Sequence, residues 1–259
     1  MPWEAALSLS PILKALSSIR RNGVQALVMG GQACVLYGAA EFSRDLDLVI
    51  VAGKSNLELL QAALRELDAH PVAVPDLGLE VLAAGHAAHF RCNREGVAGL
   101  RIFIMSKLRG VDEFEKLWAR RTTVSIEGET VELLGLDDLI RAKKTQRDKD
   151  WPMIRRLVER DYFEHRQAPG RDRVPFWLRE LRTPEILVQV ARRWPEEAAT
   201  LSGSRPAIAA ALEGDADTVA LRIRQEEETE RQRDCEYWGP LRQQLQEFRR
   251  RRRGQPRPE

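Results

Sequence analysis

The sequence predicts an α+β fold in which a mixed sheet is flanked by helices and followed by a helical C-terminal region. Three observations support this prediction. Residues 27–51 contain two apolar strand segments, joined by a glycine turn and a short helical segment. Residues 54–105 then combine an amphipathic helix with several short strand patterns. Beyond residue 136 the pattern is almost wholly helical.

Composition limits the class of protein. The 259 residues are 43% hydrophobic, which is enough for a sizeable core, and 41 basic residues nearly balance 39 acidic ones. Cys34, Cys92 and Cys235 are odd in number and widely spaced, so we expect reduced thiols rather than disulfides or a zinc cluster. No apolar run reaches membrane-spanning length, and no signal-peptide core is found. We therefore expect a cytoplasmic protein with no membrane partner.

In the first half of the chain, local sequence patterns predict helices, strands and a hairpin. Ser10 and Pro11 predict an N-cap and a first helical position, for a helix that ends near residue 22. A second helix is expected over residues 57–69, and strands over residues 79–82, 87–92 and 100–105. A hairpin of residues 122–126 and 130–134 should turn at Glu127 and Gly128.

Residues 136–166 are predicted to form one long helix. In it Lys143, Arg147 and Asp150 are spaced i, i+4 and i+7, which would place them on one face. Two interpretations of this face stay open. It is either a solvated surface held by ion pairs, or a surface from which a basic residue reaches a phosphate.

The remaining sequence predicts a boundary and further helices. Proline and glycine among charged residues at 167–173 indicate a loop, and helices follow with an interruption near Gly239 and Pro240. Five consecutive arginines at residues 249–253 are typical of a solvated tail. We therefore expect a sheet-containing domain at 1–166, a helical region at 174–248 and a basic disordered tail at 249–259.

Two aspartates are the main candidates for chemistry. Asp45 and Asp47 alternate with Leu46 and Leu48 on a predicted strand, so both carboxylates share one face while the leucines point into the core. Neighbouring carboxylates repel each other unless a cation lies between them. Mg²⁺ bound by one or two carboxylates plus substrate phosphates is the usual solution. The pair therefore predicts a magnesium site.

A glycine turn precedes this strand. Gly30 and Gly31 lie where a strand passes into a helix, and residues without a Cβ there let backbone N–H groups approach a phosphate closely. The simpler interpretation is an ordinary turn, with the two aspartates at a strand edge. The glycines and the aspartates together, in this order and on these elements, favour the phosphate and metal site.

The combination resembles the signature of the DNA polymerase β-like nucleotidyltransferase superfamily. With Arg44 before the aspartates and a short intervening helix, it resembles the small prokaryotic members grouped with abortive-infection toxins. The resemblance implies a nucleotidyltransferase-like sheet, with Mg²⁺ on Asp45 and Asp47 and the triphosphate of an NTP at the glycine turn. Residues 143–150 also resemble the helix that follows the core in this family, from which Lys143 would reach the phosphates, as Arg44 would.

One residue departs from the family pattern. The resemblance implies a third carboxylate on a neighbouring strand, which serves as base for the attacking hydroxyl. The matching strand is residues 100–105, where Phe103 falls at the expected position. Glu80 or Asp76 would be substitutes from elsewhere. The departure affects activity and leaves the fold prediction unchanged.

Three functional hypotheses follow. The first is Mg²⁺-dependent transfer of a nucleoside monophosphate from an NTP to a hydroxyl of an RNA, a protein or a small molecule. The second is a catalytically degenerate relative that binds a nucleotide or nucleic acid, with an antitoxin or other protein partner in a toxin–antitoxin or defence pair. The third is an interaction protein that acts through its C-terminal helices and arginine tail.

Overall fold

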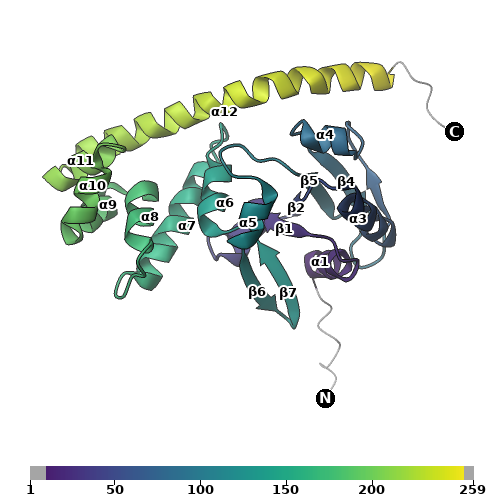
Figure 1. Cartoon of the computed structure of the whole chain (residues 1–259), viewed down its shortest axis with the longest axis horizontal. Helices are drawn as coiled ribbons and strands as arrows, with labels where there is room; N and C mark the ends of the chain where they lie inside the picture. Colours follow the sequence, from purple (N-terminus) through teal and green to yellow (C-terminus); the bar gives the residue numbers. More distant parts are fainter. Residues whose placement is uncertain (1–9, 254–259) are drawn as a thin grey trace. The chain divides into compact units, whose positions relative to one another are not determined.

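The structure is a computed structural model that describes residues 10–253, and it divides into two compact units (Figure 1). The sheet unit contains the described parts of Met1–Leu36, Glu41–Leu139 and Trp238–Glu259. The helical unit contains Tyr37–Ala40 and Ile140–Tyr237. The main division thus falls at residue 139, before the loop at 167–173 where the sequence placed a domain boundary.

The sheet unit begins with alternating helices and strands and ends with two hairpins. Its elements are α1 (Pro11–Arg21), β1 (Ala26–Met29), α2 (Gly30–Leu36), β2 (Asp45–Ile50), α3 (Lys54–Glu66), β3 (Ala69–Pro71), α4 (Leu79–Ala83), β4 (Ala88–Cys92), β5 (Arg101–Met105), α5 (Phe114–Ala119), β6 (Thr122–Ile126) and β7 (Glu129–Leu133).

The seven strands form one mixed sheet in the order β3-β4-β5-β2-β1-β7-β6. β2 lies at its centre, antiparallel to β1 and parallel to β5. β1 and β7 are also parallel, while the pairs β3–β4, β4–β5 and β6–β7 are antiparallel. With helices beside the sheet and a helical C-terminal region, the predicted α+β class is confirmed.

The core of this unit depends on the alternation of the central strand. Leu46 and Leu48 are fully buried, while Asp45 and Asp47 on the other face are half-buried. Ile102 and Ile104 of β5 stand beside these two leucines and are also fully buried. A period of two in the sequence therefore produces one apolar and one polar face at the centre of the sheet.

Several local predictions are confirmed. The Ser10 hydroxyl accepts a hydrogen bond from the Leu13 amide at 3.2 Å, which caps α1 as expected. The β6–β7 hairpin turns at Glu127 and Gly128, both with positive φ (51° and 80°), as a type I′ turn requires. β4 and β5 correspond to the strands predicted over residues 87–92 and 100–105, and they pair as an antiparallel hairpin.

The prediction of a strand over residues 79–82 is wrong, because this segment is helix α4. β4 already pairs with β3 on one side and β5 on the other, so no edge beside it is left for another strand. Gly78 precedes the helix in an extended conformation, and α4 inserts Leu82 into the core while Leu79 stays exposed. An apolar run this short fits either element, and tertiary packing decides between them.

In the helical unit the short helices α8 to α11 pack on one another, including pairs that are not adjacent in the chain, such as α9 with α11 and α8 with α10. Two of the helices that build it, α6 and α12, continue into the sheet unit. The elements are α6 (Leu136–Lys143), α7 (Asp150–His165), α8 (Arg173–Glu180), α9 (Pro184–Arg193), α10 (Pro195–Ser202), α11 (Pro206–Glu213) and α12 (Ala216–Arg253). Trp177 at its centre is fully buried and donates from its indole nitrogen to Asp161 at 2.7 Å.

The single helix predicted over residues 136–166 is wrong, because α6 and α7 are separated by residues 144–149. Thr145 provides the reason. Its hydroxyl accepts a hydrogen bond from the Arg147 amide and donates one to Asp150, and its carbonyl accepts one from the Trp151 indole. Such local side-chain bonds compete with helical ones. The expected shared face of Lys143, Arg147 and Asp150 is therefore absent as a helical surface.

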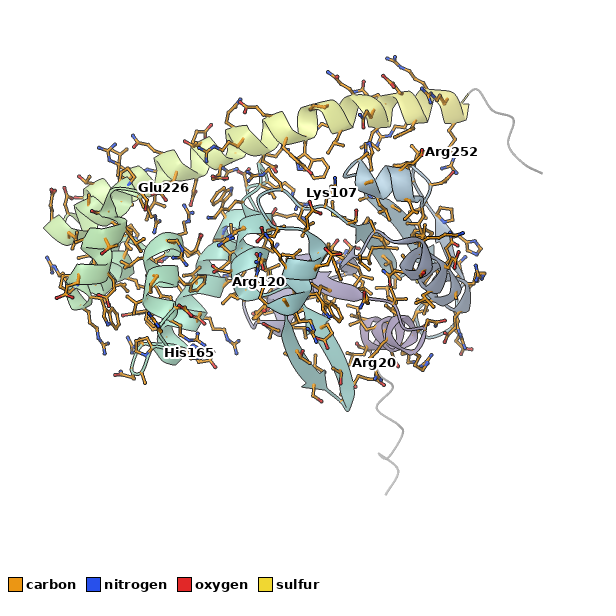
Figure 2. All side chains as sticks on the ribbon, in the orientation of Figure 1. Arg20, Lys107, Arg120, His165, Glu226 and Arg252 are labelled. Carbon is orange, nitrogen blue, oxygen red and sulfur yellow. The ribbon has the colours of Figure 1, made fainter. Side chains whose placement is uncertain are left out.

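The final helix is longer than predicted. α12 continues through Pro240 without the interruption expected there. The preceding Gly239 has no Cβ to clash with the proline ring, which makes a helical conformation easier at that position. α12 also includes the arginines at 249–253, where the sequence predicted the start of a tail; Arg252 is labelled on this part of the helix in Figure 2. The rest of that predicted tail, residues 254–259, lies outside the described residues.

Candidate nucleotide site

The candidate site lies on the polar face of β2. Asp45 and Asp47 project from this face two residues apart, and the buried leucines between and after them anchor the strand. The predicted orientation of both carboxylates is confirmed by this burial pattern. Asp47 pairs with Met29 of β1 on one side and Phe103 of β5 on the other, while Asp45 pairs with Arg101 of β5.

The glycine turn lies directly against Asp47. Gly30 follows β1 with a φ of +66°, and a Cβ built on it would lie 1.9 Å from Asp47 Oδ2. The Gly31 amide donates a hydrogen bond of 3.4 Å to the same oxygen. A residue with a side chain at position 30 would therefore collide with the carboxylate. The structure brings the two predicted halves of the motif into contact.

Arg101 is a site residue that the sequence reasoning missed. It is the β5 neighbour of Asp45 in the parallel β2–β5 pairing. Its Nε lies 2.8 Å from Asp45 Oδ1, and its Nη2 lies 3.4 Å from Oδ2. A signal was present, because Phe103 had been placed on the face of the aspartates and Arg101 is two residues before it. A strand's period of two puts both residues on that face.

Phe103 occupies the place predicted for it. It is the direct β5 neighbour of Asp47, so the side chain beside this aspartate is aromatic where the family resemblance implied a carboxylate. On its other side Phe103 meets His89 of β4, edge to face, with ring centroids 4.6 Å apart. Burial lowers the pKa of His89, which favours the neutral imidazole at this position. Across β2, β5 and β4 the adjacent side chains are therefore those of Asp47, Phe103 and His89.

The two predicted basic residues have different surroundings. Arg44 is exposed just before β2, with its guanidinium 5.9 Å from the centre of the Phe42 ring. Lys143 belongs to the helical unit and is buried, with its ammonium 3.0 Å from Asp150 Oδ1. Asp150 also receives the Arg147 guanidinium at 2.9 Å. In this structure Lys143 is a partner in an ion pair, and its role toward a phosphate stays a prediction.

The candidate metal donors on β2 are two carboxylates, those of Asp45 and Asp47. Within residues 10–253 no cluster of three or more His, Cys, Asp or Glu side chains could hold a metal. Two carboxylates on one face nevertheless match the way proteins bind Mg²⁺ with substrate phosphates completing the shell. Asp45 and Asp47 are therefore the residues that could hold such an ion, and the Mg²⁺ itself stays a prediction.

The glycine turn, the Asp-x-Asp strand and the mixed sheet stand in the arrangement that the resemblance implied. The abortive-infection type stays a prediction. No helix among the described residues has both the length and the apolar character needed to cross a membrane.

Comparison with known proteins gives matches in structure. No protein-family model and no curated protein matches the chain. A candidate nucleotidyltransferase from H. pylori is similar over 85% of this chain and 93% of its own, with 15% identity and a TM-score of 0.38. An antigenic nucleotidyltransferase-like protein from Paracoccidioides brasiliensis is similar over 78% of this chain and 90% of its own, with 19% identity and a TM-score of 0.39.

Proposed function

We propose that this chain binds a nucleoside triphosphate together with Mg²⁺ at Asp45 and Asp47, and that it transfers the nucleoside monophosphate slowly to a hydroxyl acceptor. The acceptor class is an RNA, a protein or a small molecule. The observation that carries the proposal is the contact of the Gly30 turn with Asp47, because it joins a phosphate-approach element to a carboxylate pair.

The two carboxylates supply the binding. Asp45 and Asp47 would hold the Mg²⁺ that accompanies the triphosphate, and that ion neutralises negative charge developing on the phosphates. Gly30 lets the Asp47 carboxylate lie close against the backbone of the turn, since no Cβ projects there, and the metal-binding group is thereby held beside the turn that would face the phosphates.

Arg101 controls the charge of the pair before substrate binds. Its guanidinium neutralises Asp45, so the free protein carries less negative charge at the site than two bare carboxylates would. The two side chains are 44% and 30% exposed, and ion pairs this exposed contribute only about 0–1 kcal/mol. Substrate can therefore separate them at low cost. The released guanidinium then has a fork suited to phosphate oxygens.

Phe103 explains why transfer should be slow. An aromatic ring beside Asp47 accepts no proton from the attacking hydroxyl, and general-base catalysis typically contributes about 10² to 10⁴-fold in rate. With Phe103 in place of a carboxylate, the cation also has one negatively charged ligand fewer nearby. Weak Mg²⁺ affinity and slow transfer therefore have the same cause.

A second candidate function is a catalytically degenerate relative that binds nucleotide without turnover, as one member of a toxin–antitoxin or defence pair. The ion pair of Arg101 with Asp45, together with Phe103, favours it, because both reduce the acidic character of the site. Incubating the protein with labelled NTPs and cell extract separates the two functions. A labelled acceptor supports slow transfer, whereas binding without any labelled product supports the degenerate relative.

Binding is tested by calorimetry with Mg²⁺ and an NTP. The variant Asp45→Ala/Asp47→Ala should lose binding, while Glu58→Ala/Glu115→Ala removes the same charge from exposed helical positions and should bind like the wild type. Equal binding by the wild type and the Asp45→Ala/Asp47→Ala variant would contradict the proposed site.

The slow step is tested with Phe103→Asp. This variant should bind Mg²⁺ more tightly and raise the transfer rate, at a cost of about 1–3 kcal/mol in stability from lost packing. Turnover is compared at a temperature where both proteins are folded. A wild type that already turns over rapidly, with the variant no faster, would mean that another residue supplies the base.

A further inference from the structure

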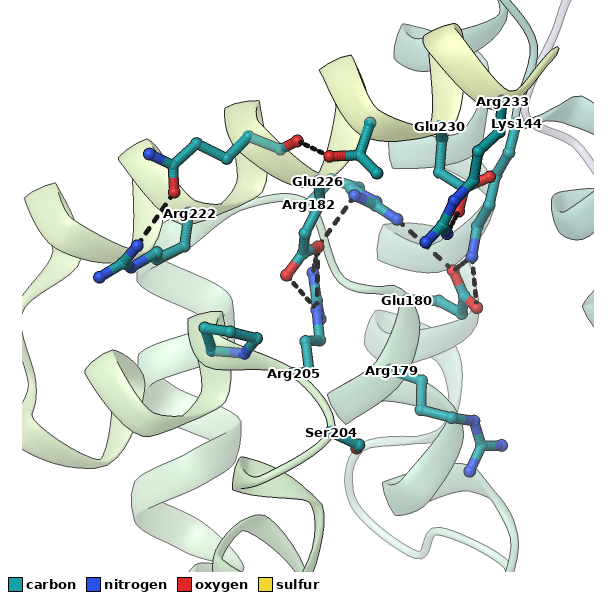
Figure 3. A pocket seen from close by; sticks show the side chains of 13 residues that line it. Lys144, Arg179, Glu180, Arg182, Ser204, Arg205, Arg222, Glu226, Glu230 and Arg233 are labelled. Carbon is teal, nitrogen blue, oxygen red and sulfur yellow. Dashed lines mark hydrogen bonds and ion pairs between the residues drawn. The ribbon is translucent and has the colours of Figure 1, made fainter. Parts of the chain in front are cut away.

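The helical unit contains a basic pocket that the proposed function does not use (Figure 3). Its volume is about 480 Å³, and its walls come from α8, the segments before α9 and α11, the residue after α6 and the first half of α12. Six of the lining side chains are basic and three are acidic, which leaves three positive charges in excess. Pockets of about 300–1,000 Å³ are typical of small-molecule sites.

The innermost part of the pocket is a buried ion cluster with its own positive excess. It consists of Lys144, Arg182, Arg205, Glu180 and Glu226, three cations against two carboxylates. Figure 3 shows Glu226 of α12 reaching both arginines, and Glu180 lying between Lys144 and Arg182. Among these five side chains the positive charges exceed the negative ones by one, and the nearby Glu227 also acts electrostatically on Arg182. The side chains of Arg182 and Arg205 are the buried cations of the cluster, and buried charges are costly unless they are paired.

All three nitrogen atoms of the Arg205 guanidinium donate hydrogen bonds within the protein. Its guanidinium donates to the Leu178 carbonyl at 2.6 Å and to the Leu181 carbonyl at 2.8 Å, and it also binds Glu226 at 3.0 Å. Burial lowers the pKa of Arg205, Glu226 acts against that effect, and the positive charge of Arg182 adds to it. The two arginines thus repel each other across a shared glutamate.

The Arg182 guanidinium has hydrogen-bond donors that the cluster leaves unsatisfied. Its Nη1 donates to Glu226 Oε2 at 3.2 Å, while its Nη2 lies 3.8 Å from Glu180 Oε2, too far for a hydrogen bond. Its Nε is buried and has no hydrogen-bond partner. The Nε and Nη2 edge of a guanidinium is the fork that binds an oxyanion with two parallel bonds. Leaving these donors unpaired in a buried side chain costs free energy.

The outer part of the pocket extends the positive field. Arg222 and Arg233 of α12 are exposed and line it, at the far ends of the segment that carries Glu226. Pro206 at the N-terminus of α11 also lines it, which adds the positive end of a helix dipole. An anion can therefore reach Arg182 along a basic path.

We propose that this pocket binds a phosphate-bearing small molecule, with one phosphate group placed at the free edge of the Arg182 guanidinium and the rest of the molecule held near Arg222 and Arg233. A phosphate group fits better than a single carboxylate, because it brings about 1.5–2 negative charges against an excess of three. A small molecule fits better than an RNA strand, because the unpaired donor is buried and nucleic-acid backbones contact mainly exposed basic residues. This site is independent of Asp45 and Asp47.

The experiment measures binding of inorganic pyrophosphate to the full chain by calorimetry, in a chelator and without Mg²⁺. Arg182→Gln should weaken binding by about tenfold or more, because it removes a charge-assisted hydrogen-bonding fork. Arg222→Gln/Arg233→Gln should weaken it several-fold without touching the buried cluster. The matched control Arg156→Gln/Arg171→Gln removes two exposed arginines outside the pocket from the same unit and should bind like the wild type.

The outcomes separate this site from the other one. Pyrophosphate binding that is kept in Asp45→Ala/Asp47→Ala and reduced in Arg222→Gln/Arg233→Gln supports the proposal, even if Arg182→Gln fails to fold. Loss of binding in the aspartate variant would assign the anion to β2 and overturn it. Equal weakening in the arginine control would mean unspecific electrostatic attraction and would also overturn it. So would binding of single-stranded RNA with no binding of pyrophosphate.

Discussion

Replacing Gly30 with alanine is expected to destabilise the sheet unit and to disturb Asp47 at the same time. Two separate costs arise from the geometry. Gly30 has a φ of +66°, a conformation that costs an L-residue about 1–2 kcal/mol. An alanine Cβ would also lie 1.9 Å from Oδ2, 2.6 Å from Cγ and 2.8 Å from Cβ of Asp47. These distances are far inside van der Waals contact, so the aspartate must move.

The second cost is estimated from what Asp47 loses when it moves. Its carboxylate accepts the Gly31 amide at 3.4 Å, a long bond for which about 1 kcal/mol is a reasonable value. Together with the backbone strain, the free energy of unfolding should fall by about 2–3 kcal/mol. Urea unfolding of both proteins, followed by circular dichroism, measures this difference.

Gly99 provides the matched control. Its φ is +82°, but a Cβ built on it meets nothing within 4 Å. Gly99→Ala should therefore show only the backbone cost of about 1–2 kcal/mol. Adding Asp47→Ala to Gly30→Ala removes the two shortest contacts, so the two substitutions should be coupled by about 0.5–3 kcal/mol. Equal loss of stability in Gly30→Ala and Gly99→Ala, with no coupling to Asp47→Ala, would refute the contact.

Two further predictions concern buried titratable groups. Burial acts to raise the pKa of Asp150, but the charge of Lys143 and the Thr145 hydroxyl outweigh it, so the folded-state pKa lies below the ordinary value. A carboxyl group with a depressed pKa stabilises the fold above its unfolded pKa of about 3.9, and this stabilisation is lost as the pH falls through the folded pKa. Asp150→Asn should therefore lower the free energy of unfolding at pH 7. The difference from the wild type should shrink as the pH drops below about 4. Urea unfolding at several pH values measures this, and a difference unchanged down to pH 2 would contradict it. Burial, followed by the charge of Asp68, raises the pKa of Cys92 to about 11, so the folded protein at pH 8 should leave Cys92 unmodified by a thiol reagent while the half-buried Cys235 reacts. Peptide mapping after labelling checks this, and rapid labelling of Cys92 without unfolding would count against its burial.

Much of the sheet unit was predictable because its signals are local. The alternation of Asp45, Leu46, Asp47 and Leu48 determines which side chains share a face, since a strand's period of two is a property of the backbone itself. The Ser10 cap and the β6–β7 turn are likewise set by a few adjacent residues. Phe103 was placed with the help of the family resemblance, which implied the neighbouring strand, and the period of two then put its side chain on the face of the aspartates.

Other features depended on which strands and helices meet. Arg101 reaches Asp45 only because β5 pairs with β2 in one register, and the two residues are 56 positions apart in the chain. A shift of one residue would turn every β5 side chain to the opposite face. Residues 79–82 form α4 because the neighbouring strand edges are already paired. Neither the β2–β5 register nor the pairing of the strand edges near α4 can be inferred from local sequence patterns.

The sequence by itself determined the α+β class, the central aspartate pair and the glycine turn before it, because local periodicity and backbone sterics decide these features. Only the tertiary structure decided the division at residue 139, the break between α6 and α7, and the basic pocket. The pocket joins Lys144, Arg182, Arg205 and Glu226 from separate segments of the helical unit. Burial and charge there arise from how the helices pack, and each segment alone has the pattern of an ordinary solvated helix or loop.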